Sequence, residues 1–265
     1  MTIEFISEGK GTPVLFIPGS YSTPSAWKPI KSKLKAEISF YSISLCGCGK
    51  TDETRTFDDC GIEHQTKLIS YAIEKIGSPV HLVGHSFGGF VSLAFAQQEP
   101  NMLQSLTLFE ANPLSLLAKY GPNGYFDEVM AVSRRFLKNI NDRVENPAES
   151  IIDFYGGMGF FGSMPDNIKK ACNAAAPANC LDWQGAPHFH LNEKSLRSFS
   201  NPTIIAYGDK TNKYMKSVTK HLSNTMQKAQ TNKIPGAGHF LISTHPKECA
   251  FLIEQNIKQS NQESL

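Results

Sequence analysis

Several common features are missing from this chain of 265 residues. It has no run of 18 apolar residues, so a membrane-spanning helix is not expected, and its start shows no basic region followed by an apolar one, as a secretory signal would. It has no basic cluster and a net charge of only +2, which argues against a nucleic-acid partner. Its six cysteines are irregularly spaced and form no Cys-x-x-Cys pair, which is typical of free cytosolic thiols rather than a metal site. We therefore expect a cytoplasmic protein without a bound metal.

Short apolar runs alternate with helical patterns along most of the chain. The runs lie at 14–17, 38–45, 81–83, 105–109, 203–207 and 233–234, and most of them end at glycine or proline, as buried parallel strands do. Helical patterns lie at 25–35, 62–76, 90–98, 214–222 and 245–257. This alternation predicts an α/β fold, with a mostly parallel central sheet flanked by helices.

One long segment interrupts this alternation. Between residues 112 and 201 no strand pattern is visible, and the stretches 126–140 and 149–154 have helical spacing. The glycine- and aromatic-rich run 155–162 is a poor helix former. We therefore predict a core made of residues 1–111 and 202–265, with a helical cap, or lid, formed by residues 112–201.

The most specific motif is Gly84-His85-Ser86-Phe87-Gly88, which follows a predicted strand and precedes a predicted helix. This is the context that a Gly-x-Ser-x-Gly nucleophile elbow requires. A serine hydroxyl is a weak nucleophile, so it must be held exposed on a sharp turn beside a base. Ser86 is therefore the candidate nucleophile, although a chance loop of the same composition is the plain alternative.

Two further loops follow predicted strands. Pro235-Gly236-Ala237-Gly238-His239 precedes the last helix, so His239 is the candidate base; an ordinary surface histidine is the alternative. The early loop from Phe16 to Tyr21 could supply one backbone amide of an oxyanion hole, with the amide of Phe87 as the other. We assign the early donor to Ser20, with Tyr21 as a second choice.

These segments, in this order, resemble the serine α/β-hydrolase superfamily, and the resemblance covers nearly the whole chain. It implies the α/β-hydrolase fold and the Ser86–His239 pair. Two segments depart from the usual pattern: Pro18-Gly19 replaces His-Gly, and the segment 44–49 lacks the usual aspartate. These departures touch neither the nucleophile nor the base.

The acidic member of the triad has two candidates. The resemblance implies an acid three residues after Gly208, but Thr211 stands there and Asp209 comes two positions early. Glu110 ends the strand that follows the nucleophile elbow, and strand ends on one edge of a parallel sheet face the same cleft. A further resemblance, to a little-characterised bacterial group that carries glutamate at this place, favours Glu110, with Asp209 as the alternative.

Together these features predict a serine hydrolase that cleaves an ester, lactone or thioester of a small, partly apolar molecule through an acyl-enzyme. An acyltransferase, a carbon–carbon hydrolase or a perhydrolase could use the same triad, and a non-catalytic ligand-binding module is a further alternative. We expect no cofactor, no membrane partner, and a monomer or homodimer. The residues expected to contact the substrate are Tyr21, His85, Tyr155, Met158, Phe160 and Phe161.

Overall fold

The apolar runs of the chain form one seven-stranded sheet in the computed structural model, which describes residues 1–263. Its strands lie in the order β1-β3-β2-β4-β5-β6-β7, and only β1 is antiparallel to its neighbour. The fold class predicted from the sequence is confirmed. The strands are β1 (Phe5–Gly9), β2 (Thr12–Ile17), β3 (Ile38–Ile43), β4 (Val80–His85), β5 (Leu103–Phe109), β6 (Thr203–Gly208) and β7 (Ala229–Ile234).

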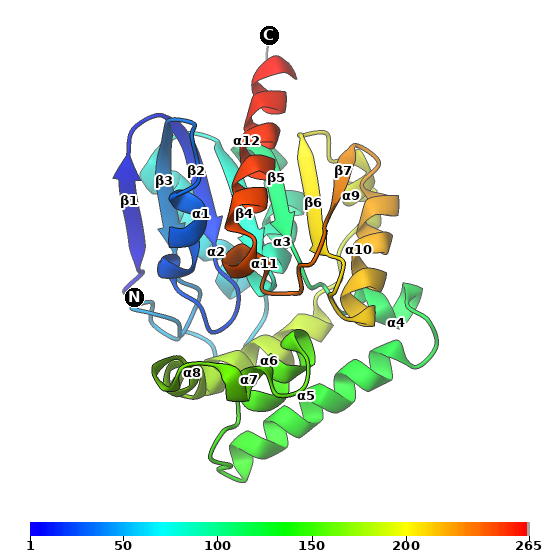
Figure 1. The fold of residues 1–265 in the computed structure, drawn as a ribbon. Coiled ribbons are helices and arrows are strands. Elements are labelled where there is room, and N and C mark those ends of the chain that lie inside the picture. Colours follow the sequence, from blue (N-terminus) through cyan, green and yellow to red (C-terminus); the bar gives the residue numbers. More distant parts are fainter. Residues whose placement is uncertain (264–265) are drawn as a thin grey trace.

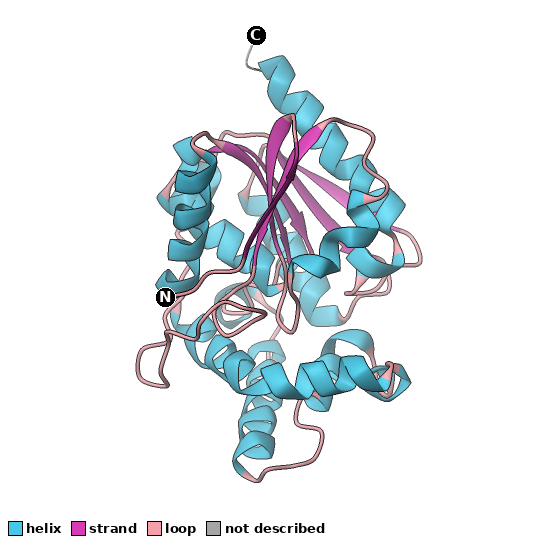
Figure 2. Ribbon diagram, turned by 90° about the vertical axis from the view of Figure 1, so that its left-hand side faces the viewer, coloured by secondary structure: helices cyan, strands magenta, loops and turns pink. Residues whose placement is uncertain are grey.

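Helices cover both faces of this twisted sheet (Figures 1 and 2). One face packs against η1 (Pro24–Trp27), α1 (Lys28–Lys31), α11 (Leu241–Thr244) and α12 (Pro246–Glu263), and the other against α2 (Glu63–Ile76), α3 (Phe87–Gln98) and α10 (Lys213–Thr225). The short helix η2 (Pro100–Met102) precedes β5. Each face has its own apolar cluster, because alternate side chains of a strand point to opposite sides of a sheet.

The chain between β5 and β6 contains no strand, and its residues 125–185 lie beyond one end of the strands, where Figure 1 shows them below the core. We call the whole segment between β5 and β6 the cap. Its apolar side chains join the cluster on the α2–α3 face, so it packs onto the core. Its helices are α4 (Leu116–Tyr120), α5 (Tyr125–Asn141), α6 (Glu149–Gly156), α7 (Phe160–Ser163), α8 (Asp166–Gly185), η3 (Ala186–His188) and α9 (Glu193–Ser198).

Several elements were not predicted from the sequence, among them β1, α8 and the short cap helices α4, α7 and α9. The strand β1 has a half-exposed, partly polar pattern, because it is the antiparallel edge of the sheet. Helix α8 continues through Pro177, and burial of side chains such as Trp183 offsets the backbone hydrogen bond that the proline removes. Within residues 1–263, no helix combines the length and apolar character needed to span a bilayer. Residues 264 and 265 of the expected core segment lie outside the described residues.

Candidate active site

Ser86 lies at a sharp turn between β4 and α3. Its backbone has φ 53° and ψ −123°, a combination that residues other than glycine rarely adopt. The turn packs closely against the β2 loop: a Cβ atom on Gly88 would lie 2.3 Å from the carbonyl oxygen of Pro18. The amide of Ser86 donates to the carbonyl of Phe109 (2.9 Å), which ties the turn to the end of β5. The Ser86 hydroxyl is therefore held at the carboxyl edge of the sheet.

A continuous chain of hydrogen bonds runs from this serine to a carboxylate. His239 lies 2.9 Å from the Ser86 hydroxyl through Nε2 and 3.1 Å from Glu110 Oε2 through Nδ1. Because a carboxylate only accepts, Nδ1 carries the proton, and Nε2 is free to accept the proton of Ser86. All three residues are at least 94% buried. The chain of contacts is therefore shielded from competing water.

The two acid candidates occupy different surroundings. Glu110 Oε1 accepts from the Gly208 amide and Oε2 accepts from the Thr211 hydroxyl, both at 2.8 Å. Asp209 instead accepts from the amide of Gly236 at 2.7 Å, within the turn after β7. The structure thus brings Glu110, and not Asp209, into contact with His239.

Aromatic and polar residues enclose the histidine ring. Tyr155, from α6 of the cap, stacks on it with 4.1 Å between ring centroids, and His85 donates from Nε2 to the His239 carbonyl at 3.0 Å. Burial, with the nearby His239, lowers the pKa of His85 to about 3, so this ring is neutral. Asn112 donates to the Tyr155 hydroxyl at 2.8 Å and lies 3.5 Å from the Ser86 hydroxyl. Asn112 was not singled out from the sequence, because nothing but its place two residues after Glu110 marked it.

The two expected oxyanion-hole donors flank the nucleophile. Phe87 is the first residue of α3, so its amide has no acceptor within the helix. The amide of Ser20 has no hydrogen-bond acceptor among residues 1–263. Gly19 allows the loop to approach, since a Cβ atom there would lie 3.0 Å from the Cβ of Ser86. Tyr21, next in the loop, has a strained φ of 60°.

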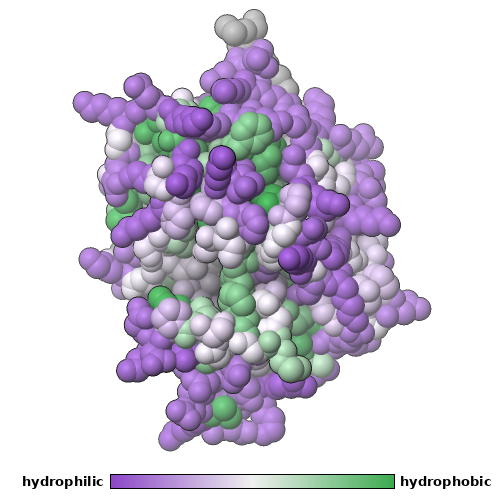
Figure 3. Space-filling view, viewed as in Figure 1, coloured by the Kyte–Doolittle hydropathy of each residue, from purple (hydrophilic) through white to green (hydrophobic). Residues whose placement is uncertain are grey.

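A cavity of about 100 Å³ lies beside Ser86, between core and cap. On the face drawn in Figure 3, apolar and weakly polar residues gather where the core and the cap meet. Three of the expected contact residues, Tyr21, His85 and Tyr155, line the cavity. Cap residues such as Val129, Ile152 and Trp183 add apolar surface.

The other three expected contact residues do not line this cavity, which corrects the sequence-based expectation. Met158 is fully exposed, Phe161 is buried in the core cluster, and Phe160 stacks on Phe240. The reason is a local turn in which Asp153 accepts from the amides of Gly159 and Phe161 at 2.8 and 2.7 Å. This turn directs the residue before Gly159 outward.

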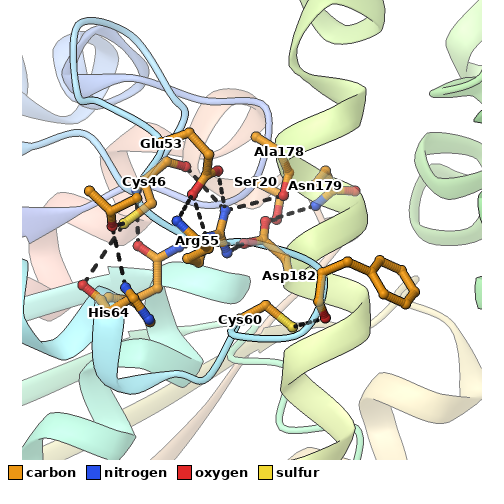
Figure 4. Close-up of polar contacts among 12 residues, drawn as sticks. Ser20, Cys46, Glu53, Arg55, Cys60, His64, Ala178, Asn179 and Asp182 are labelled. Carbon is orange, nitrogen blue, oxygen red and sulfur yellow. Dashed lines mark hydrogen bonds and ion pairs between the residues drawn. The ribbon is translucent and has the colours of Figure 1, made fainter.

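A buried ion pair joins the cap to the core beside the cavity (Figure 4). Arg55, in the loop between β3 and α2, donates to Asp182 of α8 at 2.6 Å and to Glu53 at 2.8 Å. Asp182 also accepts from Ser20 Oγ at 3.2 Å and from Asn179 at 3.0 Å. No sequence motif marks this network, because Arg55 and Asp182 lie far apart along the chain.

Comparison with known proteins agrees with this geometry. Residues 14–250 match the Alpha/beta hydrolase family. The chain belongs to this family. This α/β-hydrolase is 21% identical over 237 residues to 2-hydroxy-6-oxo-2,4-heptadienoate hydrolase of Pseudomonas putida. The alignment covers 88% of this chain and 84% of the relative. It is 24% identical over 242 residues to Lipase 3 of Moraxella sp., and this alignment covers 86% of this chain and 72% of the relative. The crystal structure of bromoperoxidase from Bacillus anthracis has the same fold, with a TM-score of 0.78 and 21% sequence identity. The match covers 97% of this chain and 95% of that chain.

Proposed function

We propose that this α/β-hydrolase is a serine hydrolase that cleaves a carboxylic ester, lactone or thioester through an acyl-enzyme on Ser86. The observation that carries the proposal is the hydrogen-bond chain from the Ser86 hydroxyl through His239 to Glu110. The strained backbone of Ser86 supports it, because such strain persists mainly where function requires it. Relatives named hydrolase and lipase agree with a hydrolytic reaction.

The reaction follows from the roles of the three residues. Nε2 of His239 takes the proton as the Ser86 oxygen attacks the substrate carbonyl, and Glu110 stabilises the resulting imidazolium. The amides of Phe87 and Ser20 hold the oxyanion, and losing one such donor typically costs about 10²–10³-fold in kcat. His239 then gives its proton to the leaving alcohol or thiol. In the second half it activates the water that releases the acid from Ser86.

The surroundings of the nucleophile support a substrate that is apolar in part. The cavity lies directly beside Ser86 and His239. Its walls include Leu114, Phe126 and Ile151 as well as polar side chains. A mostly apolar acyl group therefore suits this cavity.

The direct test is covalent labelling with a fluorophosphonate, followed by intact-mass measurement. We expect one adduct on the wild-type protein and none on Ser86→Ala. Ser22→Ala is the matched control, because Ser22 also lines the cavity but makes no contact with His239. Labelling that persists in Ser86→Ala, or that is absent from the folded wild type, would contradict the proposal.

A further inference from the structure

The part of the cavity beside α8 is more polar than the rest of the surface that the cap contributes. Tyr21 from the β2 loop and Asn179 and Asp182 from α8 all line it, and we call these three residues the α8 corner. The remaining cap contribution is mostly apolar, with residues such as Val129 and Ile152. Polar groups concentrated at one corner of an apolar pocket are the usual means of fixing the orientation of a ligand.

Two polar atoms of the α8 corner make no hydrogen bond within the described residues. They are the hydroxyl of Tyr21 and Oδ1 of Asn179, and the Asn179 side chain donates through Nδ2 to Asp182. Asn179 is only 3% exposed. Since buried polar groups are nearly always paired in proteins, unpaired ones on side chains that line a cavity point to a polar ligand group. Tyr21 adds an independent sign in its strained φ of 60°.

The charges around the corner decide which polar group fits. Arg55 is shared between two carboxylates, Glu53 and Asp182, and its own side chain is 1% exposed. No lysine or arginine lines the cavity in the described part of the chain. A ligand carboxylate would therefore approach Asp182 without a free cation to neutralise it, and like charges in a dry site repel strongly.

We propose that the α8 corner binds a hydroxyl group of the substrate and discriminates against a carboxylate at the same place. A hydroxyl can donate to Asn179 Oδ1 and accept from the Tyr21 hydroxyl, so its hydrogen-bonding chemistry matches both unpaired atoms. A carboxylate only accepts, and it leaves Asn179 Oδ1 unpaired. This inference rests on the proposed function, because it names the substrate class of the same site.

The test compares three p-nitrophenyl esters of equal length: hexanoate, 6-hydroxyhexanoate and the monoester of adipate. We expect kcat/KM about tenfold higher for the hydroxy ester than for the hexanoate, as one net hydrogen bond gives, and at least about tenfold lower for the carboxylate. Three esters with equal kcat/KM, or a preferred carboxylate, would overturn the inference.

Variants locate the effect. Tyr21→Phe should lower the preference for the hydroxy ester over the hexanoate about tenfold. Tyr207→Phe is the matched control, because Tyr207 lies on β6 and does not line the cavity; it should leave the preference unchanged. Should Tyr21→Phe fail to fold, Asn179→Ala tests the same corner. An unchanged preference in a folded corner variant contradicts the assignment.

A binding measurement separates this inference from the proposed function. The Ser86→Ala protein is titrated with 6-hydroxyhexanamide and with hexanamide, neither of which requires turnover. We expect about tenfold tighter binding of the hydroxy amide. Equal affinities for the two amides overturn the hydroxyl site even if a fluorophosphonate labels Ser86. Tighter binding of the hydroxy amide without labelling of Ser86 would support the hydroxyl site and refute the acyl-enzyme.

Discussion

Replacing Glu110 by glutamine tests the candidate acid with almost no change of shape. Glu110 Oε1 accepts from the Gly208 amide, and Oε2 accepts from Thr211 and His239. A glutamine that keeps the Gly208 bond must place its NH₂ group against Nδ1 of His239. That group donates to Nδ1, so the imidazole proton moves to Nε2, which can no longer accept the proton of Ser86.

The magnitude follows from the alternative orientation of the amide. Turning the glutamine would restore the correct tautomer, but its NH₂ would then face the Gly208 N–H across 2.8 Å. Leaving those buried donors unpaired costs about 1–3 kcal/mol, so the productive form falls roughly 5–150-fold in population. Loss of the charge that stabilises the imidazolium adds to this. We expect kcat to fall about 10³–10⁴-fold, as for other triads that lose their acid.

The assay is hydrolysis of p-nitrophenyl butyrate, with kcat and KM determined separately and thermal unfolding as a check on folding. Asp209→Asn is the matched control, because asparagine keeps an acceptor for the Gly236 amide. It should stay within about twofold of wild type. A folded Glu110→Gln protein with kcat reduced less than tenfold, or an equal loss in Asp209→Asn, would refute the assignment.

Three further predictions follow from the same contacts. Thr211→Val removes the hydroxyl that donates to Glu110 and should lower kcat about tenfold with KM unchanged, in the same ester assay. Burial lowers the pKa of His81 to about 4 and of His85 to about 3. As the pH falls, the unfolded chain therefore takes up these protons before the folded protein does. The free energy of unfolding should keep its highest value above about pH 6.5 and fall by about 1.4 kcal/mol per pH unit per histidine as the pH drops toward 4. Urea titrations at several pH values should show that the free energy of unfolding depends less steeply on pH in His81→Asn than in the wild type. An equal dependence on pH would contradict this. Met158 is exposed, so Met158→Ser should keep kcat/KM within about twofold of wild type in the same assay. A larger loss would indicate that Met158 contacts the substrate.

The core of the fold was predictable because its signals are local. Parallel strands buried on both faces give continuous apolar runs, and the inner strands β2, β4, β5 and β6 are largely of this kind. The two edge strands, β1 and β7, pair along one side only and carry more polar residues, and β1 was missed for this reason. Helix α8 was missed for the opposite reason: Pro177 argues locally against a helix, and the packing that overrides it comes from residues distant in sequence.

The candidate site divides in the same way. Ser86 and His239 stand in short motifs at strand ends, so the chain itself indicates where they meet. The choice between Glu110 and Asp209 depended on strand pairing and side-chain reach, and before the structure only the place of Glu110 at a strand end and a family resemblance favoured it. Asp182 was missed because its partner Arg55 comes from a loop more than 100 residues earlier. Contacts of this kind arise only when the cap packs on the core.

The position of the acid depends on two residues together, Glu110 and Thr211. Strands β5 and β6 pair in parallel, with Phe109 beside Ala206, so residues just beyond them approach the same histidine. Glutamate at 110 reaches His239 from β5, and threonine at 211 supplies a hydroxyl to the carboxylate from the place where the family resemblance implies an acid. An aspartate at 211 beside Glu110 would put two carboxylates in one dry site, where one must take up a proton. An acid at 211 is therefore incompatible with an ionised Glu110, whereas a hydroxyl there supports it, and the departure at Thr211 strengthens the assignment of Glu110.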